Sequence, residues 1–255
     1  FRKKYLIFLF MNEKNILIFI PAYNVEKKIL TVIERIPNNI FSEYHISILV
    51  INDNSEDNTR QIVENYIKNK NLGERIILIN NKSNQGYGGV QKIAFDYAIK
   101  YNYDYAIMLH GDGQYLSEKI PEFISYLSTH SADAIFGSRM INPKDALKGG
   151  MPLYKFIGNK FLSFIQNMIL GSNFSEFHSG YRSFKVNALK KINYKINTNN
   201  YHFDTQIMIQ FLKSNLKIKE IAIPTFYGDE ISHLKSIPYG INILKTTVLY
   251  HFFKK

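Results

Sequence analysis

The sequence predicts an α/β protein with a mainly parallel β-sheet covered by helices on both faces, and two features of the chain support this prediction. Short, almost entirely apolar runs alternate with longer segments of helical periodicity. Strands that are buried on both faces of a parallel sheet have this continuous apolar character. The 255 residues are also enough for one domain with a large hydrophobic core, and they contain no low-complexity linker. We therefore expect a single domain.

The expected elements follow this alternation along the chain. Strands are predicted at residues 16–20, 46–51, 76–79, 105–109, 134–137 and 218–223. Helical patterns are predicted at about 26–35, after the potential N-caps Ser55 and Asp57, at 89–101 and from about Ser117. Strands that alternate with helices in this way indicate crossover helices on both sides of the sheet.

The later part of the chain has a different character. Residues 143–151 are predicted to form a loop, and an apolar helical stripe follows over 152–170. The tail, 237–253, is also apolar and aromatic, and two lysines follow it. Either helix is compatible with packing on the core and with lying at a membrane surface. No other segment is long and apolar enough to suggest a membrane span.

The net charge of +11 suggests an anionic partner. Nucleic acid is not expected, because the lysines are scattered and no recognised nucleic-acid-binding motif occurs. Anionic lipid headgroups or pyrophosphate groups would explain the charge, and so would a solvated, lysine-rich surface without a specific partner. Cysteine is absent, which excludes disulfides and thiolate metal sites and is compatible with the cytoplasm. No motif indicates an oligomeric state.

The first ten residues imitate a short signal sequence. Their apolar run is too short to span a bilayer, and Met11 resembles a natural start. We interpret residues 1–10 as an upstream extension.

The segment 105–115 is the most informative of the chain, because an apolar run leads directly into His110, Asp112 and Gln114. A carboxylate between two glycines at the end of a core strand lies at the edge where open α/β sheets bind ligands. Asp112 beside a side-chain amide suits Mg²⁺ or Mn²⁺ that bridges phosphate oxygens. The alternative is a tight Asp-Gly turn that only ends the strand.

Further motifs occur in a definite order along the chain. They are the segments 16–24, 46–59, 84–89, 105–115, 137–139 and 175–182. In this order they resemble the inverting family 2 glycosyltransferases of GT-A fold, and in particular the branch of dolichol-phosphate mannosyltransferase and its bacterial polyprenyl-phosphate relatives. The resemblance implies a Rossmann-like nucleotide-sugar-binding half at about 12–140 and an acceptor-binding half at about 141–255.

The donor site is expected at the ends of the first two strands, where the crevice between strand tips is a natural nucleotide site. The candidate residues are Pro21, Ala22, Tyr23, Asn24, Glu26 and Asp53. Asp53 can accept a hydrogen bond from a ring N–H, and the corresponding residue of the resembled family contacts the base. The family's Asp-Asp-Gly-Ser motif is replaced here by 52–55, in which Asn54 can still adopt a left-handed turn. The alternative for this segment is a polar turn and helix cap.

The glycine-rich turn at 86–89 is expected to let the backbone approach a ligand. Gly86 and Gly88 open a helical pattern, and a helix N-terminus favours anions. The spacing matches neither a P-loop nor a Rossmann fingerprint, so a plain loop is the alternative.

The resemblance implies that a divalent metal, Mg²⁺ or Mn²⁺, is bound by Asp112 and neutralises the diphosphate. The family's Asp-x-Asp motif has lost its first aspartate, which is His110 here, and keeps the second. Gln114 matches a position that can add an oxygen ligand. His110 is a potential nitrogen ligand, a contact to ribose or phosphate, or a polar group that ends a strand.

The acceptor cluster is expected to include Arg139 and Arg182, which suit a phosphate group. If the acceptor is a polyprenyl phosphate, its dianionic phosphate needs no general base. A sugar hydroxyl of a cell-envelope glycan would need one, and Glu176, His178 and Asp204 are the candidates. Asp204 also fits a helix N-cap, and Arg182 a structural ion pair.

Two other classes of protein share features with this sequence. A non-catalytic nucleotide-sugar-binding protein would fit the departures at Asn52 and His110. A nucleotidyltransferase would carry an arginine-containing, glycine-rich loop after the first strand, and residues 21–24 do not provide one. We therefore expect a glycosyltransferase that acts at the cytoplasmic face of a membrane as a peripheral protein.

Overall fold

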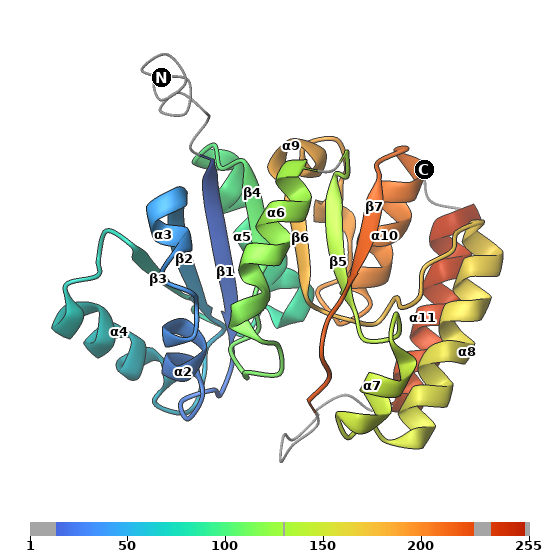
Figure 1. The fold of residues 1–255 in the computed structure, drawn as a ribbon, viewed down its shortest axis with the longest axis horizontal. Coiled ribbons are helices and arrows are strands. Elements are labelled where there is room, and N and C mark those ends of the chain that lie inside the picture. Colours follow the sequence, from blue (N-terminus) through green and yellow to red (C-terminus); the bar gives the residue numbers. More distant parts are fainter. Residues whose placement is uncertain (1–13, 130, 227–235, 253–255) are drawn as a thin grey trace, which may run out of the picture.

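The computed structural model describes residues 14–129, 131–226 and 236–252. The segment 1–10, which we interpreted as an upstream extension, lies outside the described residues, as do the last three residues of the chain. Figure 1 shows a central sheet with helices on both faces, as predicted from the sequence.

The sheet has seven strands in the order β3-β2-β1-β4-β6-β5-β7 (Figure 1). The strands are β1 (Asn15–Ala22), β2 (His45–Asn52), β3 (Ile76–Asn80), β4 (Tyr105–Met108), β5 (Ala134–Ser138), β6 (Arg182–Lys185) and β7 (Ile218–Ala222). All pairs are parallel except those of β6, which runs antiparallel to β4 and β5. The six predicted strands are confirmed. Strand β6 was not predicted, because Arg182-Ser183-Phe184-Lys185 contains no apolar run.

Helices cover both faces of this sheet. They are α2 (Ile29–Glu34), α3 (Ile40–Glu43), α4 (Thr59–Lys70), α5 (Gly86–Lys100), α6 (Ile120–Thr129), α7 (Pro143–Lys148), α8 (Leu153–Leu170), α9 (Val186–Leu189), α10 (Phe203–Lys213) and α11 (Ser236–Phe252), with short 3₁₀ turns at η1 (Ser117–Lys119) and η2 (Tyr194–Ile196). Alternate residues of β1 serve the two faces, since side chains alternate along a strand. Ile18 packs in the core cluster with Val63 of α4, and Leu17 packs in the other cluster with Phe95 of α5.

The prediction of a plain loop at 143–151 was wrong. Pro143 occupies the first turn of α7, where its missing N–H costs no helical hydrogen bond. Ala146 is buried with Met140 and Met151 and holds this short helix on the body of the protein.

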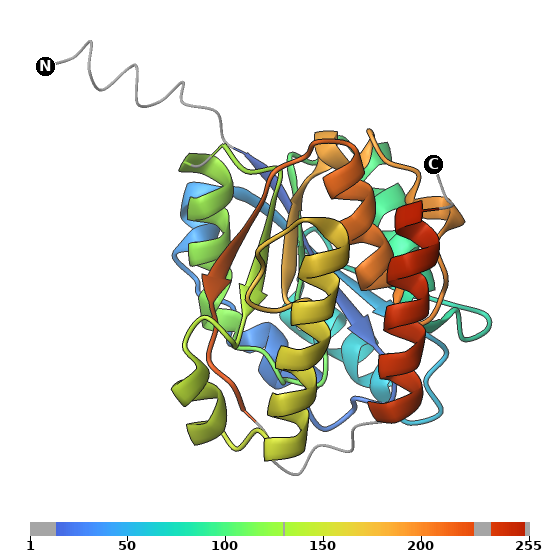
Figure 2. The same ribbon diagram turned by 90° about the vertical axis from the view of Figure 1, so that its right-hand side faces the viewer.

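Helices α8 and α11 lie side by side at the β7 end of the sheet, where Figure 2 shows them facing the viewer. Both begin at the end of the molecule to which the parallel strands point (Figure 1). In the described ranges, every helix is too short or too polar to cross a membrane.

Candidate active site

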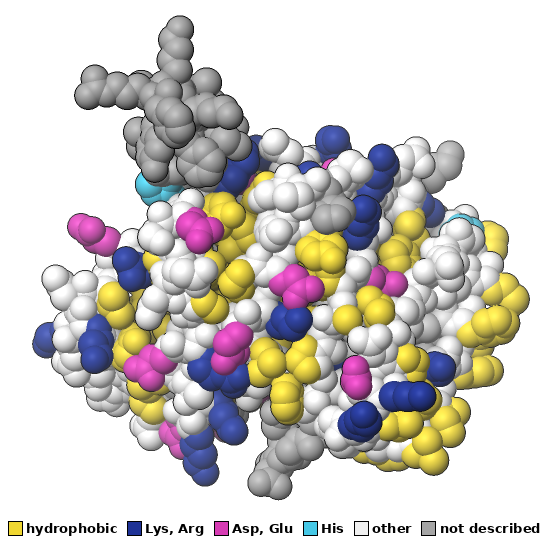
Figure 3. Space-filling view, in the orientation of Figure 1, with side chains coloured by type: hydrophobic (Ala, Val, Ile, Leu, Met, Phe, Trp, Pro, Cys, Tyr) yellow, Lys and Arg dark blue, Asp and Glu magenta, His cyan; other side chains and the backbone are white. Residues whose placement is uncertain are grey.

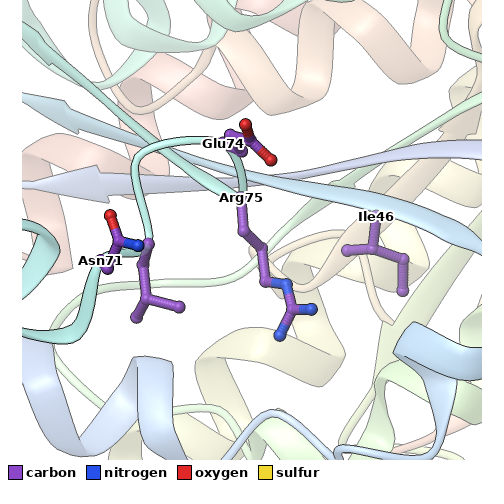
Figure 4. A pocket seen from close by; sticks show the side chains of 5 residues that line it. Ile46, Asn71, Glu74 and Arg75 are labelled. Carbon is purple, nitrogen blue, oxygen red and sulfur yellow. The ribbon is translucent and has the colours of Figure 1, made fainter.

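Polar loops gather at the carboxyl ends of β1, β2 and β4. A shallow pocket lies at the opposite end, where β2 and β3 begin, and is lined by Ile46, Asn71, Leu72, Glu74 and Arg75 (Figure 4). Its Arg75 guanidinium stacks over the ring of Phe41, at 4.6 Å from the ring centroid. Because ligands of open α/β sheets bind at the carboxyl ends of the strands, we place the candidate site at the loops.

The loops after β1 and β2 are joined by hydrogen bonds. The backbone N–H of Asn24 donates to Ser55 Oγ (3.0 Å), and the N–H of Glu56 donates to Asn24 Oδ1 (2.8 Å). Glu26 accepts from the N–H of Asn58 (3.0 Å). Asn54 has a φ of 59°, so the left-handed turn expected there is present. Tyr23 remains 42% exposed and can offer its ring to a base.

Asp53 lies beneath these loops with only 4% of its surface exposed. Its Oδ1 accepts from Asn81 Nδ2 (2.8 Å) and from the N–H of Gln85 (2.7 Å), and its Oδ2 accepts from the N–H of Gly86 (2.9 Å). The carboxylate therefore holds the glycine-rich turn in place. A contact between Asp53 and a base stays a prediction.

The glycines of that turn make room for protein rather than for a ligand. A Cβ on Gly86 would lie 2.7 Å from the carbonyl oxygen of Asn199, and Gly86 has a φ of +75°. The N–H of Gly88 donates to the same carbonyl (2.7 Å), and a Cβ there would collide with Thr198 and Phe203. This differs from the expected role of Gly86 and Gly88, because their open side faces residues 198, 199 and 203 of the same chain.

Asp112 follows β4 and is partly exposed. Its Oδ1 accepts from the N–H of Gln114 (2.9 Å), and its Oδ2 has no hydrogen-bond partner among the described residues. Burial, and after it the charge of Asp112, raises the pKa of Tyr201, which places this tyrosine beside the carboxylate. Asp112 therefore offers an oxygen to a cation next to an aromatic wall.

The described residues fit a metal that takes most of its ligands from a substrate. They contain no group of three or more His, Cys, Asp or Glu side chains with metal-binding geometry. Mg²⁺ is commonly held by one or two carboxylates and completes its shell with phosphate oxygens and water. Asp112, whose Oδ2 has no partner in the part of the chain that the structure describes, meets that requirement.

His110 is packed among aromatic rings. Its ring lies 4.9 Å from that of Tyr115 and 5.8 Å from that of Tyr87, between centroids. Its Nε2 is buried without a partner in the described structure, and a Cβ on Gly180 would lie 2.6 Å from it. This packing favours His110 as part of the wall of the site.

Arg139 and Glu176 form a buried ion pair. The N–H of Arg139 donates to Glu176 Oε2 (2.7 Å), and its guanidinium binds the same carboxylate. Asn159 of α8 donates to Glu176 Oε1 (2.7 Å). Burial by itself raises the pKa of the Glu176 carboxyl, but Arg139 and Asn159 outweigh burial and hold the pKa below its ordinary value. Glu176 is thus fully engaged, which argues against the expected role as a general base.

Arg182 differs from the expected phosphate ligand. Its side chain is 1% exposed. Its Nε, Nη1 and Nη2 donate to the carbonyl oxygens of Ser179 (2.9 Å), Asp204 (2.9 Å) and Phe177 (2.8 Å). A guanidinium that is committed to backbone carbonyls in three directions cannot also hold a phosphate in its fork. The alternative prediction, a structural ion pair, fits the structure better, since Arg182 Nη2 lies 3.8 Å from Asp204 Oδ2.

The other two base candidates are also held inside the protein. Asp204, in the first turn of α10, accepts from Tyr87 Oη (2.8 Å) and Gln91 Nε2 (3.0 Å). His178 shares a hydrogen bond with Tyr239 Oη of α11 (3.2 Å from Nδ1). Burial lowers the pKa of His178 to about 4, so its imidazole is neutral near pH 7.

Several residues that build this site were missed in the sequence. Asn159 and Tyr239 lie in apolar stretches, where they resemble helix-surface residues. Glu220 of β7 accepts from the N–H groups of Ser175 (2.7 Å) and Glu176 (3.0 Å) and so fixes the acceptor loop. Glu220, one of two charged residues in the predicted strand 218–223, was the available signal for this contact.

The mixed seven-stranded sheet, with polar loops at the strand ends and a carboxylate after β4, is the arrangement of a glycosyltransferase of GT-A type. The family model of Glycosyl transferase family 2 matches residues 17–193, and the chain belongs to this family. It is therefore an enzyme of the glycosyltransferase class, and the alternative of a non-catalytic binder is dropped.

Relatives and solved structures agree with this assignment. The UDP-N-acetylglucosamine--dolichyl-phosphate N-acetylglucosaminyltransferase of Methanococcus voltae is 32% identical over 92% of either chain. The polyprenol monophosphomannose synthase of Mycolicibacterium smegmatis is 22% identical over 84% of this chain and 78% of its own. Glucosyl-3-phosphoglycerate synthase of Mycobacterium tuberculosis, solved with Mg²⁺ and UDP, has the same fold, with a TM-score of 0.67, 13% identity and coverage of 93% and 79%.

We predict that Arg182→Lys lowers the free energy of unfolding by about 2–5 kcal/mol. An ammonium group cannot reproduce three divergent N–H donors, so buried carbonyls lose their partners. Urea unfolding measures the change. The control Arg60→Lys, at an exposed pair with Glu64, is expected to change it by less than about 1 kcal/mol. An Arg182→Lys protein as stable as the wild type would contradict the structural role.

We also predict a pH dependence of stability from His178. The pKa is 6.5 in the unfolded chain and about 4 in the folded protein, so the unfolded state takes up a proton first as the pH falls. The contribution of neutral His178 to the free energy of unfolding is complete above pH 6.5. It is lost as the pH falls from 6.5 to 4, by up to about 3 kcal/mol. Urea unfolding of wild type and His178→Gln across this range is the measurement. Parallel pH profiles for the two proteins would refute the prediction.

Proposed function

We propose that the protein transfers a sugar from a nucleoside-diphosphate sugar to the phosphate of a polyprenyl phosphate. The observation that carries the proposal is Asp112, whose Oδ2 is free to bind a cation at the end of β4, beside the loops that would hold the nucleotide. The two relatives named for dolichyl-phosphate and polyprenol substrates support this choice of acceptor class.

The donor would lie across the carboxyl ends of β1, β2 and β4. Tyr23 would cover the base, and Asp53 would hold the surrounding loop and accept from a ring N–H. Pro21 and Ala22 form the end of β1 beneath it, where Ala22 O accepts from the N–H of Asp53 (2.8 Å). UDP-N-acetylglucosamine is the first donor to test, because the relative named for it is 32% identical.

A divalent cation, Mg²⁺ or Mn²⁺, would be held by Asp112, with Gln114 as the nearest potential oxygen ligand. When bound, it offsets the charge that develops on the leaving diphosphate. We assign His110 to the wall of the site, because its Nε2 is buried against Gly180.

The acceptor side favours a nucleophile that carries its own charge. Glu176 and Asp204 are hydrogen-bonded within the protein and the pKa of His178 is lowered to about 4, so a sugar hydroxyl would meet no ready base among the three candidates. A phosphate monoester has a second pKa of about 6 and needs none. One of its oxygens would attack the anomeric carbon, the bond to the diphosphate would break, and the configuration would invert. Arg139 is our candidate contact for that phosphate, which would have to share the guanidinium with Glu176, its ion-pair partner in this structure.

A lipid-linked acceptor requires the enzyme to work at a membrane. We propose a peripheral protein at the cytoplasmic face, a location with which the cysteine-free sequence is compatible.

Donor turnover is predicted to depend on a divalent cation and on Asp112. Asp112→Asn removes the charged ligand and is expected to lower kcat/KM by about 10²-fold or more. Release of UDP with and without a chelator is the assay. Glu74→Gln, at the opposite end of the sheet, serves as the control and is expected to be fully active. Full activity of Asp112→Asn, or of wild type in excess chelator, would refute the assignment.

Transfer is predicted to occur to a lipid phosphate and not to a neutral sugar. With labelled donor, wild type is expected to form a glycosyl phosphate lipid from undecaprenyl phosphate, and no product from a neutral sugar. Product analysis by mass spectrometry separates the two. Efficient transfer to the sugar alone would overturn the proposed acceptor class.

A further inference from the structure

The outer faces of α8 and α11 are apolar although they are exposed. On α8 six large apolar side chains are each 58% to 67% exposed. On α11 the corresponding residues are 39% to 64% exposed. We call this set the outer helix surface: Leu153, Tyr154, Ile157, Phe161, Phe164 and Met168 on α8, and Ile241, Val248, Leu249 and Phe252 on α11. Yellow apolar atoms gather at the corresponding margin of the molecule in Figure 3.

The spacing puts these side chains on one face of each helix. Residues 157, 161, 164 and 168 are three or four positions apart, as are 241, 245, 248 and 252, and such residues lie in one stripe. The face of α8 that points inward is polar instead, since Asn159, Ser163 and Gln166 are buried. Helix α8 is thus inverted relative to an ordinary surface helix of a globular protein, whereas α11 is apolar on both sides, since Ile243 and Tyr250 are buried.

The inward polar contacts prevent the helices from turning their apolar faces inward. Asn159 donates to Glu176, and Gln166 Nε2 donates to Thr247 Oγ1 of α11 (3.3 Å). Rotation of α8 would remove Asn159 from a buried carboxylate, which is costly. The apolar exposure is therefore a fixed property of the fold, and contiguous exposed apolar surface of this kind marks an interaction site.

The charges around the surface identify the partner. Neither helix contains an aspartate or a glutamate, while Lys155 and Lys160 lie on α8 and Lys245 lies within the apolar stripe of α11. Two copies joined through this face would bring like charges together. An anionic bilayer offers both an apolar interior for the aromatic rings and negative headgroups for the lysines.

We propose that the outer helix surface docks on an anionic lipid bilayer and inserts its aromatic and aliphatic side chains at the headgroup boundary. The same two helices reach the acceptor loop from inside, through Asn159 to Glu176 and through Tyr239 to His178. Docking therefore brings the acceptor cluster next to the membrane, where a lipid phosphate is presented. This last step rests on the proposed function.

Vesicle flotation of the full chain tests the docking. Wild type is expected to float with vesicles of phosphatidylcholine and phosphatidylglycerol, more weakly with phosphatidylcholine alone, and less as salt is added. Phe161→Ser together with Phe164→Ser is expected to weaken partitioning by about tenfold or more for each ring lost. Tyr101→Ser, an exposed aromatic residue at the end of α5 that is 53% exposed, is the matched control and is expected to float like wild type.

Three outcomes would overturn the proposal. The first is that wild type does not float with anionic vesicles, and the second is that the double variant floats equally well. The third is that wild type forms a stable dimer whereas the double variant is a monomer. The last result, from sedimentation velocity without lipid, would make the surface a subunit interface.

A vesicle-free assay with a short, water-soluble prenyl phosphate separates this proposal from the proposed function. Transfer without vesicle binding would overturn the docking alone. Vesicle binding without transfer would refute the acceptor assignment and leave the docking intact.

Discussion

A buried guanidinium is costly unless it is hydrogen-bonded, and the loop before β6 and the start of α10 are arranged around the guanidinium of Arg182. Its three nitrogens bind the carbonyl oxygens of residues 177, 179 and 204, which belong to the acceptor loop and to the first turns of α10. The guanidinium also stacks over the ring of Phe136 on β5, 4.4 Å from its centroid. One side chain from the antiparallel strand β6 therefore fixes a loop, a helix and a neighbouring strand in mutual register. The positions of Glu176, His178 and Asp204 all follow from it.

The carboxylates near the site act in a similar way, because most of them organise loops. Asp53 holds the turn that opens α5, Glu220 holds the N–H groups at the start of the acceptor loop, and Asp204 receives Tyr87 and Gln91 from α5. Each accepts two or more hydrogen bonds, so the loops are ordered before any ligand binds. Asp112 differs, since one of its oxygens is unpaired within the described structure. A charge held ready at that point is the kind of preorganised group that stabilises a developing charge at low reorganisation cost.

The sequence predicted the sheet well because its parallel strands are continuous apolar runs, but it could not assign roles to the polar residues. Strand β6 was not predicted, because residues 182–185 form a strand through their pairing with β4 and β5 and not through their composition. Arg182 was expected to bind an acceptor phosphate and Glu176 was a candidate general base, because arginine and carboxylate patterns are the same for a ligand site and for a buried network. Which of the two occurs depends on contacts between segments far apart in the chain, such as Asn159 with Glu176. Gly86 and Gly88 were recognised as special for the right physical reason, close backbone approach, but the approaching group is Asn199 of the same chain.

The inverted character of α8 connects the buried polar network to the exposed apolar surface. A helix that buries asparagine, serine and glutamine and exposes phenylalanine is unfavourable for an isolated soluble domain, since apolar burial is the main source of stability. Its inner polar residues are nevertheless required, because Asn159 completes the hydrogen bonds of a carboxylate that in turn holds Arg139. The helix therefore serves the site on one side and is left apolar on the other. A partner that supplies an apolar medium resolves this conflict without any change of the inner contacts, which is why the surface and the acceptor cluster are best understood as one unit.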